Sequence, residues 1–481
     1  MNAPFSSYLT GIAPGLKELI ALLRQRFDYV SVLSTDSVGF SVSISQRAKS
    51  VSRNTIATER GTVVRVYRDQ LYAESAFTGF DPGKVQETFE KITGELDAQL
   101  RLLKATGVKP YKTGILPDEA RTVFAEMETG RLPEEEDISS LVDRLSAVSD
   151  KGMEQGRAQG LNLIDCMVRA SSTHVCKLFL TEKQDLRQSY VFSEGMCAGL
   201  IAGEERTDFA YTSLSGRKGP ELFDSMEEKI PEVIRIGKDL VSAERVEPGE
   251  YDIITSPEVT GLIAHEAFGH GVEMDMFVKG RALGKDYIGK RVGSDMVTMH
   301  EGALCAVDVT SYAFDDEGTP AGDVTEIDKG ILRGGICDAL SALRLGVNPT
   351  GNGKRENFAH KVYTRMTNTV FNSGESTLEE MIASIQKGYL LEGMQSGMED
   401  PKHWGIQCII KLGREIKDGS LTGRVFAPII MTGYVPDLLG NITMRSRDRE
   451  VFGNGGCGKG HKEWVKVADG GPYLKTKARL G

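Results

Sequence analysis

Cysteine is scarce in this sequence, and the cysteines are scattered along it. The 481 residues include seven cysteines, an odd number, and no two of them stand in a CxxC arrangement. Disulfide-stapled secreted scaffolds use even sets of cysteines, so this class is excluded and a reducing cytoplasm is the expected location. The first twenty residues, MNAPFSSYLTGIAPGLKELI, also lack a basic stretch followed by an apolar core, so we expect no secretory signal.

Positive charge and long apolar runs are lacking as well. The formal net charge is −10, whereas a nucleic-acid-binding protein presents a basic stripe to the phosphates. No apolar run approaches the roughly 18 residues that a membrane-spanning helix needs. We therefore expect neither nucleic acid nor a membrane as a partner, and we attribute the diffuse negative charge to solubility.

The remaining composition is that of an ordinary globular protein. Hydrophobic residues make up 40% and charged residues 26% of the chain, and this length suits two or three domains. The patterns predict an α+β protein, with a mixed sheet and long helices in an N-terminal α/β region and a strand-rich C-terminal region that carries the candidate site. We expect an N-terminal α+β domain at 1–110, a middle α/β region at 111–245 and a C-terminal domain at 246–481.

Hydrophobic periodicity places the main elements. Apolar residues at helical spacing predict helices at 14–27 with Pro14 near the start, at 84–105, at 138–158, and at 219–243 with an interruption before Pro231. Alternating and β-branched runs predict strands at 29–44, 60–77, 161–215, 251–256, 303–310, 407–416 and 424–435. The segment 109–137 is rich in Pro, Gly, Glu and Asp, which is typical of a linker or loop.

Histidine is rare, with seven in the chain, yet two lie close together in TGLIAHEAFGHGVEMD (260–275). A zinc peptidase needs two neutral imidazoles and one further ligand for the ion, and an open position for water. It also needs a carboxylate beside that water to accept a proton. His265 and His270 are therefore candidate ligands, and Glu266, next to the first of them, is the candidate base.

The spacing of the two histidines is unusual. The common motif places them four residues apart on one face of a helix, whereas His265 and His270 are five apart. Five residues advance about 500° on a regular α-helix, which leaves the rings about 140° apart. Either a π-turn absorbs the extra residue, or the helix unwinds at Gly269 and His270 returns to the metal from outside it.

The third ligand has a distant candidate and two near ones. Cys457 lies between glycines in FGNGGCGKGHKEW (452–464), and a thiolate binds zinc strongly. Glu273 and Asp275 follow the motif directly and are either possible ligands, partners of the histidine N–H groups or surface charges at a helix end. His461 is a further possible ligand, or a surface or supporting group.

Each of these residues also has a purely structural interpretation. Two histidines on one turn can cap a helix or line a core, and a lone cysteine is usually inert. The acidic run at 315–318, Asp-Asp-Glu-Gly, lacks the alternating oxygens and distal Glu of an EF-hand. We expect it to form an exposed hairpin turn.

The motif and several flanking segments resemble the TldD/PmbA family of zinc metallopeptidases, on its metal-binding TldD side. The resemblance is carried by HEAFGHGVEMD, GGCGKG, the DDEGTP stretch within 311–338 and RMTNTVFNSGESTLEEMIASIQKGYLLEG (365–393). The resemblance covers roughly 245–460 well. In the N-terminal half it extends only to the general succession of helical and strand-like segments. The sequence departs from the family pattern in two places. His461 falls near the position of a glutamine that is usual in the family, and MRSRDREVFGNGG before Cys457 differs from the usual segment. These departures put the substrate preference in doubt.

The resemblance implies one Zn²⁺ per chain on His265, His270 and Cys457, with Glu266 as base. It implies a cytoplasmic peptidase acting on peptides or unfolded segments, in a homodimer or in a heterodimer with a related subunit. Two alternatives stay open: a non-catalytic peptide-binding or chaperone-like subunit with a structural zinc, and a metal-dependent hydrolase of a non-peptide amide. The intact Glu266 counts against the first, because a structural zinc needs no base.

Overall fold

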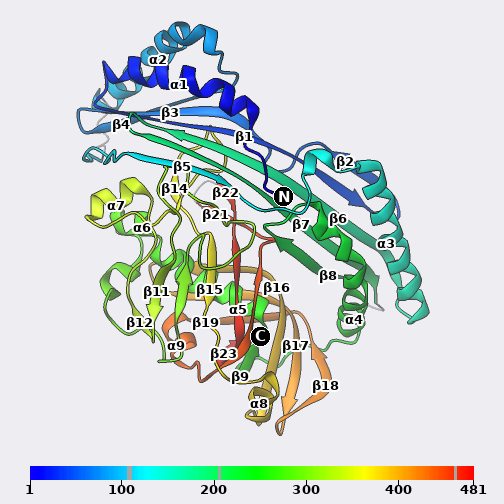
Figure 1. The fold of residues 1–481 in the computed structure, drawn as a ribbon. Coiled ribbons are helices and arrows are strands. Elements are labelled where there is room, and N and C mark those ends of the chain that lie inside the picture. The colour runs from blue at the N-terminus through cyan, green and yellow to red at the C-terminus, as the bar shows by residue number, and fades with distance from the viewer. Residues whose placement is uncertain (106–110, 204–206, 460–462) are drawn as a thin grey trace.

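The computed structural model describes residues 1–105, 111–203, 207–459 and 463–481. Helices and strands mix in an α+β fold with two large sheets, and Figure 1 shows the N-terminal sheet arching over the C-terminal half. No helix in these residues is both long and apolar enough to cross a membrane. The predicted fold class is confirmed, whereas the three domain boundaries stay a prediction.

The N-terminal sheet has eight strands, ordered β4-β3-β1-β6-β7-β5, with β2 beside β1 and β8 beside β7. They are β1 (Tyr29–Ile44), β2 (Lys49–Ser52), β3 (Arg60–Arg68), β4 (Leu71–Phe77), β5 (Arg121–Glu126), β6 (Leu163–Leu180), β7 (Gln184–Ala202) and β8 (Thr207–Gly216). Every pairing is antiparallel except that of β5 with β7, so the sheet is mixed.

Two pairs of helices cover this sheet (Figure 1). They are α1 (Ser7–Arg24) with α2 (Val85–Ala105) at one end, and α3 (Ile138–Ala158) with α4 (Ile230–Val241) at the other. The buried stripe of α1 includes Leu9, Leu16 and Leu23, seven residues apart, as expected for an amphipathic helix on a sheet. The predicted helices are therefore present. The first begins earlier than predicted, and a 3₁₀ stretch precedes the last.

The helix starts reflect capping that periodicity does not reveal. The helix α1 begins at Ser7, because the Ser6 side chain accepts a hydrogen bond from the backbone N–H of Leu9. Pro14 therefore lies inside this helix and not near its start. The segment 219–243 contains a 3₁₀ stretch, η3 (Pro220–Lys229), before α4, and Pro231 lies in the first turn of α4, so the predicted interruption is confirmed.

The C-terminal sheet has eleven strands and closes on itself. Its strands are β9 (Gly249–Thr255), β10 (Met299–Glu301), β11 (Val324–Asp328), β12 (Ile331–Leu332), β15 (Asn368–Phe371), β16 (Lys387–Asp400), β17 (Gly405–Lys417), β18 (Ser420–Phe426), β19 (Ile429–Tyr434), β20 (Met444–Phe452) and β23 (Ala468–Leu480). The path β23-β19-β17-β16-β9 returns to β23, which closes a barrel. Two small hairpins stand apart: β13 (Gly353–Lys354) with β14 (Tyr363–Thr364), and β21 (Gly456–Lys459) with β22 (Glu463–Lys466).

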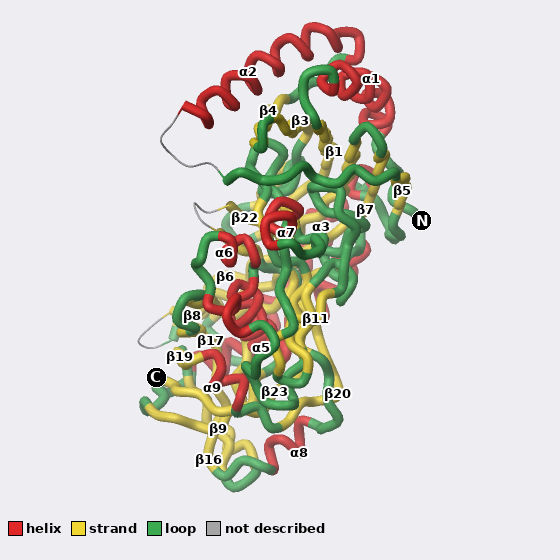
Figure 2. The backbone as a smooth tube through the Cα atoms, turned by 90° about the vertical axis from the view of Figure 1, so that its left-hand side faces the viewer, coloured by secondary structure: helices red, strands yellow, loops and turns green. Residues whose placement is uncertain are grey.

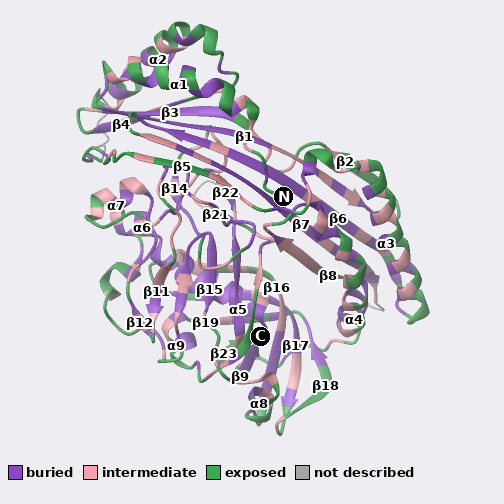
Figure 3. Ribbon diagram, in the orientation of Figure 1, coloured by how far each residue is buried: buried purple, intermediate pink, exposed green. Residues whose placement is uncertain are grey.

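Short helices, red in Figure 2, connect these strands: α5 (Pro257–Ala264), α6 (Met274–Val278), α7 (Ala339–Leu345), α8 (Leu378–Ala383) and α9 (Val435–Gly440). The helix α5 matters most for the site. Its side chains are buried apart from that of Glu258, and it packs against β23 and β16. Figure 3 shows this buried centre in purple. Because α5 is held on several sides, the residues that follow it have a rigid support.

Two sequence expectations in this half are wrong. The predicted strand at 303–310 forms turns, because side chains occupy its backbone carbonyl groups: Asn368 donates to the carbonyls of Gly302 and Ala306, and Ser311 also donates to Ala306. The acidic run at 315–318 is also not an exposed hairpin turn. Asp315 and Asp316 are buried.

The buried acidic run, which lies between β10 and β11, links the C-terminal half to the N-terminal sheet. Lys177 of β6 forms an ion pair with Asp316, and Arg65 of β3 forms one with Glu317. A buried carboxylate is tolerated when a cation compensates its lost hydration. These partners lie far away in the sequence, so the local pattern could not reveal them.

Candidate metal centre

The two histidines of the motif meet because the backbone widens between them. The helix α5 continues into a π-helical turn, η4 (His265–Gly269), and then into a 3₁₀ turn, η5 (His270–Val272). The backbone N–H of His270 donates to the carbonyl of His265, which is the i→i+5 bond of a π-turn. The π-turn is thus the observed solution, and the helix does not unwind at Gly269.

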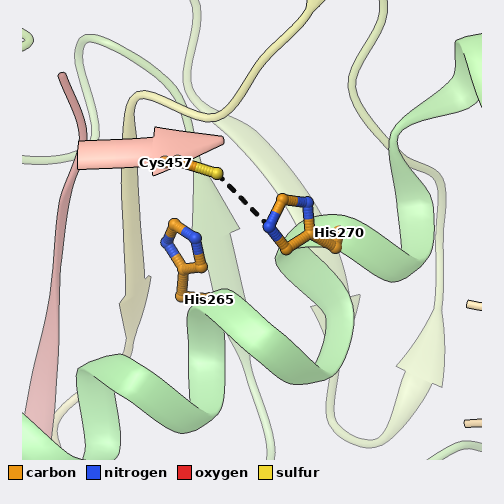
Figure 4. Close-up of side chains that lie close together, drawn as sticks. All are labelled: His265, His270 and Cys457. Carbon is orange, nitrogen blue, oxygen red and sulfur yellow. Dashed lines mark hydrogen bonds between the residues drawn. The ribbon is translucent and has the colours of Figure 1, made fainter. Parts of the chain in front are cut away.

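Three predicted ligands lie together at this turn (Figure 4). One ligand atom from each of His265, His270 and Cys457 lies within 4.8 Å of the other two. Cys457 Sγ is 3.3 Å from His270 Nε2, and the two imidazole rings are perpendicular, with centroids 5.0 Å apart. Tetrahedral zinc places a sulfur and a nitrogen ligand about 3.6 Å apart. The donor set and its spacing fit a zinc ion.

His270 is oriented by Glu273. The Nδ1 atom of His270 lies 3.0 Å from a carboxylate oxygen of Glu273. Burial opposes ionisation of Glu273, but Lys459 and His270 outweigh it and lower its pKa to about 2. An ionised carboxylate only accepts, so Nδ1 donates the hydrogen bond. Nε2 is then the nitrogen directed toward Cys457.

His265 faces a different carboxylate, that of Asp469 on β23. Its Nδ1 lies 3.5 Å from Asp469 Oδ2 and forms no hydrogen bond with the described residues. Burial alone would lower the pKa of His265, but the nearby Cys457 sulfur and Asp469 carboxylate raise it well above its usual value. Sequence reasoning missed Asp469, because it lies far along the chain and no spacing links it to the motif.

Cys457 reaches the histidines from the hairpin β21–β22. Its backbone carbonyl accepts a hydrogen bond from Arg365 at 2.7 Å, which fixes the strand at the ligand itself. Burial would raise the pKa of the thiol, but the two imidazoles lower it well below its usual value. The thiolate is the form that binds a metal ion.

The other expected supporting residues have distinct positions. Asp275 contacts no predicted ligand; it accepts hydrogen bonds from Lys459 at 2.7 Å and from Lys279 at 2.9 Å. Lys459 also pairs with Glu273 at 3.1 Å, so it ties the motif to the Cys457 strand. His461 lies outside the described residues.

Glu266 lines a cavity of about 630 Å³ together with all three candidate ligands. It is 8% exposed, and burial raises its pKa above the usual range of a carboxyl. A strand passes close to it: a Cβ at Gly397 of β16 would lie 2.6 Å from Glu266 Cγ. Only glycine at 397 leaves room for this position of Glu266.

Glu399, also on β16, is a cavity residue that sequence reasoning missed. Neither of its carboxyl oxygens has a hydrogen-bond partner among the described residues, although both are buried. Burial raises its pKa to about 9. No motif marks Glu399 in the sequence, because its position depends on the pairing of β16 with β17.

Comparison with known proteins identifies a family domain in this half of the chain. Residues 248–477 match the PmbA/TldA metallopeptidase C-terminal domain. A metalloprotease of Methanothermobacter thermautotrophicus is 30% identical over 56% of this chain and 59% of its own length. A zinc metalloprotease TldD homolog of Saccharolobus solfataricus is 32% identical over 48% of this chain and 51% of its own. The chain thus spans little more than half of these two relatives.

Other relatives match along almost the whole chain. A metalloprotease of Synechocystis is 26% identical over 98% of both chains. The crystal structure of TldE from Thermococcus kodakarensis superposes with a TM-score of 0.77, covering 97% of this chain and 100% of that one at 19% identity. That likeness concerns the fold. The domain match and the relatives agree with the motif: residues 248–477 of this chain match the C-terminal domain of the TldD/PmbA family.

Proposed function

We propose that this protein is a zinc-dependent peptidase that cleaves peptides or unfolded polypeptide segments. One observation carries the proposal: His265, His270 and Cys457 converge in one cavity with Glu266 beside them. A structural zinc site is usually closed by four protein ligands, whereas a catalytic one keeps a position for water or substrate. Three ligands facing a cavity favour the catalytic kind.

The residues of the site would have two catalytic roles, metal binding and proton transfer. His265, His270 and Cys457 would hold one Zn²⁺ per chain, which when bound polarises a carbonyl group and makes water acidic. Glu266 would accept a proton from the attacking water and return it to the departing amine. A carboxyl whose pKa is raised by burial suits both directions of transfer, because accepting and releasing the proton then differ less in free energy.

The surrounding space supports an extended substrate. The metal cavity shares Gly455 with a cavity of about 380 Å³ lined by Lys177, and with one of about 660 Å³ lined by Tyr211. These volumes suit short lengths of chain rather than a folded domain. Backbone pairing with a strand such as β16 would hold such a chain while reading few side chains, so we propose loose specificity.

Assembly and location are part of the same proposal. We propose that the chain acts in the cytoplasm as a homodimer or with a related subunit, as the family resemblance implies. None of the seven cysteines, all within the described residues, forms a disulfide, in keeping with a reducing compartment. Light scattering of the purified protein, alone and mixed with a related subunit, measures the assembly.

The activity is tested with metal-depleted protein. Fluorogenic unstructured peptides, small amides and a folded protein are incubated with the depleted protein before and after one equivalent of zinc is added. We expect zinc to restore cleavage of the peptides only. Cleavage restricted to small amides would favour the non-peptide hydrolase. Zinc binding and peptide binding without cleavage would favour the non-catalytic subunit.

A further inference from the structure

Glu399 lies in the metal cavity, and no described residue donates a hydrogen bond to its carboxyl group. It is carried by β16, opposite Ile406 of β17, and lines the cavity together with His270 and Glu266. A Cβ built on Gly271, the residue after His270, would lie 3.3 Å from Glu399 Oε1. The carboxyl group is therefore packed beside the turn that carries a candidate metal ligand.

The two carboxyl oxygens of Glu399 are buried, and no residue in the described part of the chain compensates for their lost hydration. Each oxygen is hidden from solvent and accepts no hydrogen bond from a described residue. No cationic side chain among the described residues forms an ion pair with the Glu399 carboxyl group. The one lysine among the described residues that line the cavity, Lys459, is committed to Glu273 and Asp275. A buried carboxyl without donors is unfavourable, so a group that supplies donors and positive charge gains free energy by binding here.

The wall around Glu399 suits an alkyl chain. Met276, Met394 and Met398 line the same cavity, and thioether side chains adapt to a flexible aliphatic ligand. Met398 is 66% exposed, which places it at the mouth of the cavity. Beyond the carboxylates that face the histidines or Lys459, the cavity holds two further acids, Glu266 and Glu399, so its uncommitted groups suit a ligand that is a cation.

We propose that Glu399 is a specificity residue that binds a primary ammonium group of the substrate. The group is either the free α-amino terminus or the side chain of a lysine, since both offer the same three N–H donors. The inference rests on the proposed function for the nature of the substrate as a peptide. It makes cationic peptides the preferred class.

The test measures binding separately from cleavage. Four peptides of one sequence combine a free or acetylated N-terminus with a lysine or a norleucine beside the cleaved bond. Their affinities are measured by calorimetry with zinc-loaded Glu266→Gln protein, alone and with a second change, either Glu399→Gln or Asp400→Asn. Asp400 is the matched control, because it is the next residue, exposed, and paired with His403 outside the cavity.

We expect at least one peptide with an amine to bind about tenfold more tightly than its counterpart without that amine. Glu399→Gln removes this preference and leaves the affinity of the acetylated norleucine peptide and the zinc content unchanged, whereas Asp400→Asn keeps the preference. If affinity depends on N-terminal acetylation, the α-amino group is bound; if it depends on lysine versus norleucine, the side-chain amine is bound. Equal affinities in the parent, or a preference that survives Glu399→Gln, would overturn the inference.

Cleavage of the same peptides by the otherwise unchanged protein separates the two proposals. Cleavage with no preference for an amine overturns the role of Glu399 and leaves the peptidase standing. Preference in binding with no cleavage of any peptide keeps the role of Glu399 and overturns the peptidase. Failure to bind and to cleave all four peptides overturns both.

Discussion

Glu273 Oε2 accepts a hydrogen bond from His270 Nδ1 at 3.0 Å, and the same oxygen pairs with Lys459 Nζ at 3.1 Å. One buried acid thus selects the tautomer of a candidate ligand and links it to the strand of Cys457. Carboxylates that support a metal-binding histidine raise its basicity and fix its ring. The geometry of the site therefore depends on residues beyond the three that face the cavity.

Replacing this acid tests that dependence. We expect Glu273→Gln to weaken zinc binding by about 10- to 100-fold, because the neutral amide holds the His270 ring less firmly and makes it less basic. Competition with a chromophoric chelator measures the affinity. Lys279→Met serves as a control, since it removes a partner of Asp275 but not of Glu273. An unchanged affinity in Glu273→Gln would contradict the role assigned here.

The thiolate is expected to be essential for metal binding. Cys457→Ser replaces a strong zinc ligand with a hydroxyl that stays protonated, so zinc should be lost during purification. Cys305→Ser is the matched control, because this half-buried cysteine lies away from the site and its Sγ donates to the Asn368 carbonyl, as a serine also could. Elemental analysis of both variants, with circular dichroism for folding, is the measurement. Full zinc content in folded Cys457→Ser would show that the ligand lies elsewhere.

Glycine at 397 allows Glu266 to occupy its observed position. Gly397→Ala places a methyl group 2.6 Å from Glu266 Cγ, which must move the base. A displacement near 1 Å can reduce a rate about 100-fold, so we expect peptide cleavage to fall by this order while zinc stays bound. Gly405→Ala on the neighbouring strand meets nothing within 4 Å and should leave the rate unchanged. Equal rates for the two variants would contradict the proposed position of the base.

The N-terminal sheet contains a histidine whose charge should make stability depend on pH. Burial opposes protonation of His174, but its contacts with Cys176 and Glu134 raise its pKa to about 10 from an ordinary 6.5. The folded state therefore binds this proton more tightly than the unfolded state. The resulting stabilisation is complete below pH 6.5 and is lost as the pH rises toward 10.

Denaturant unfolding of the parent and of His174→Gln at pH 6.5, 8 and 10 measures this effect. We expect the difference in unfolding free energy to be largest at pH 6.5 and to shrink at each higher pH. His403→Gln, at an exposed histidine, is the control for the substitution itself. A difference that is constant over this range would mean that His174 is neutral in the folded protein.

The sequence predicts the fold class and the family because both depend on local signals. The HEAFGHGVEMD and GGCGKG motifs carry the family, and helical and strand periodicity carry the α+β class. The five-residue spacing of His265 and His270 left two backbone solutions open, since the same sequence is compatible with a π-turn and with a helix that unwinds at Gly269. Only the path after α5 distinguishes them.

What the sequence could not predict depends on contacts between distant segments. Asp469 on β23 and Glu399 on β16 reach the cavity because these strands pair with other strands of the C-terminal sheet, which no sequence spacing reveals. The acidic run at 315–318 has the composition of an exposed turn but is buried, because Lys177 and Arg65 of the other sheet neutralise it. Local composition describes a segment, whereas burial is decided by its partners.

The most direct test compares the parent protein with Glu266→Gln for zinc content and for hydrolysis of one unstructured peptide. We expect one zinc per chain in both, and cleavage that falls by about 100- to 10,000-fold in the variant, because only the proton carrier is lost. Zinc in both with equal cleavage would contradict the role of Glu266. Absence of zinc from both, after purification without chelators, would contradict the metal centre itself.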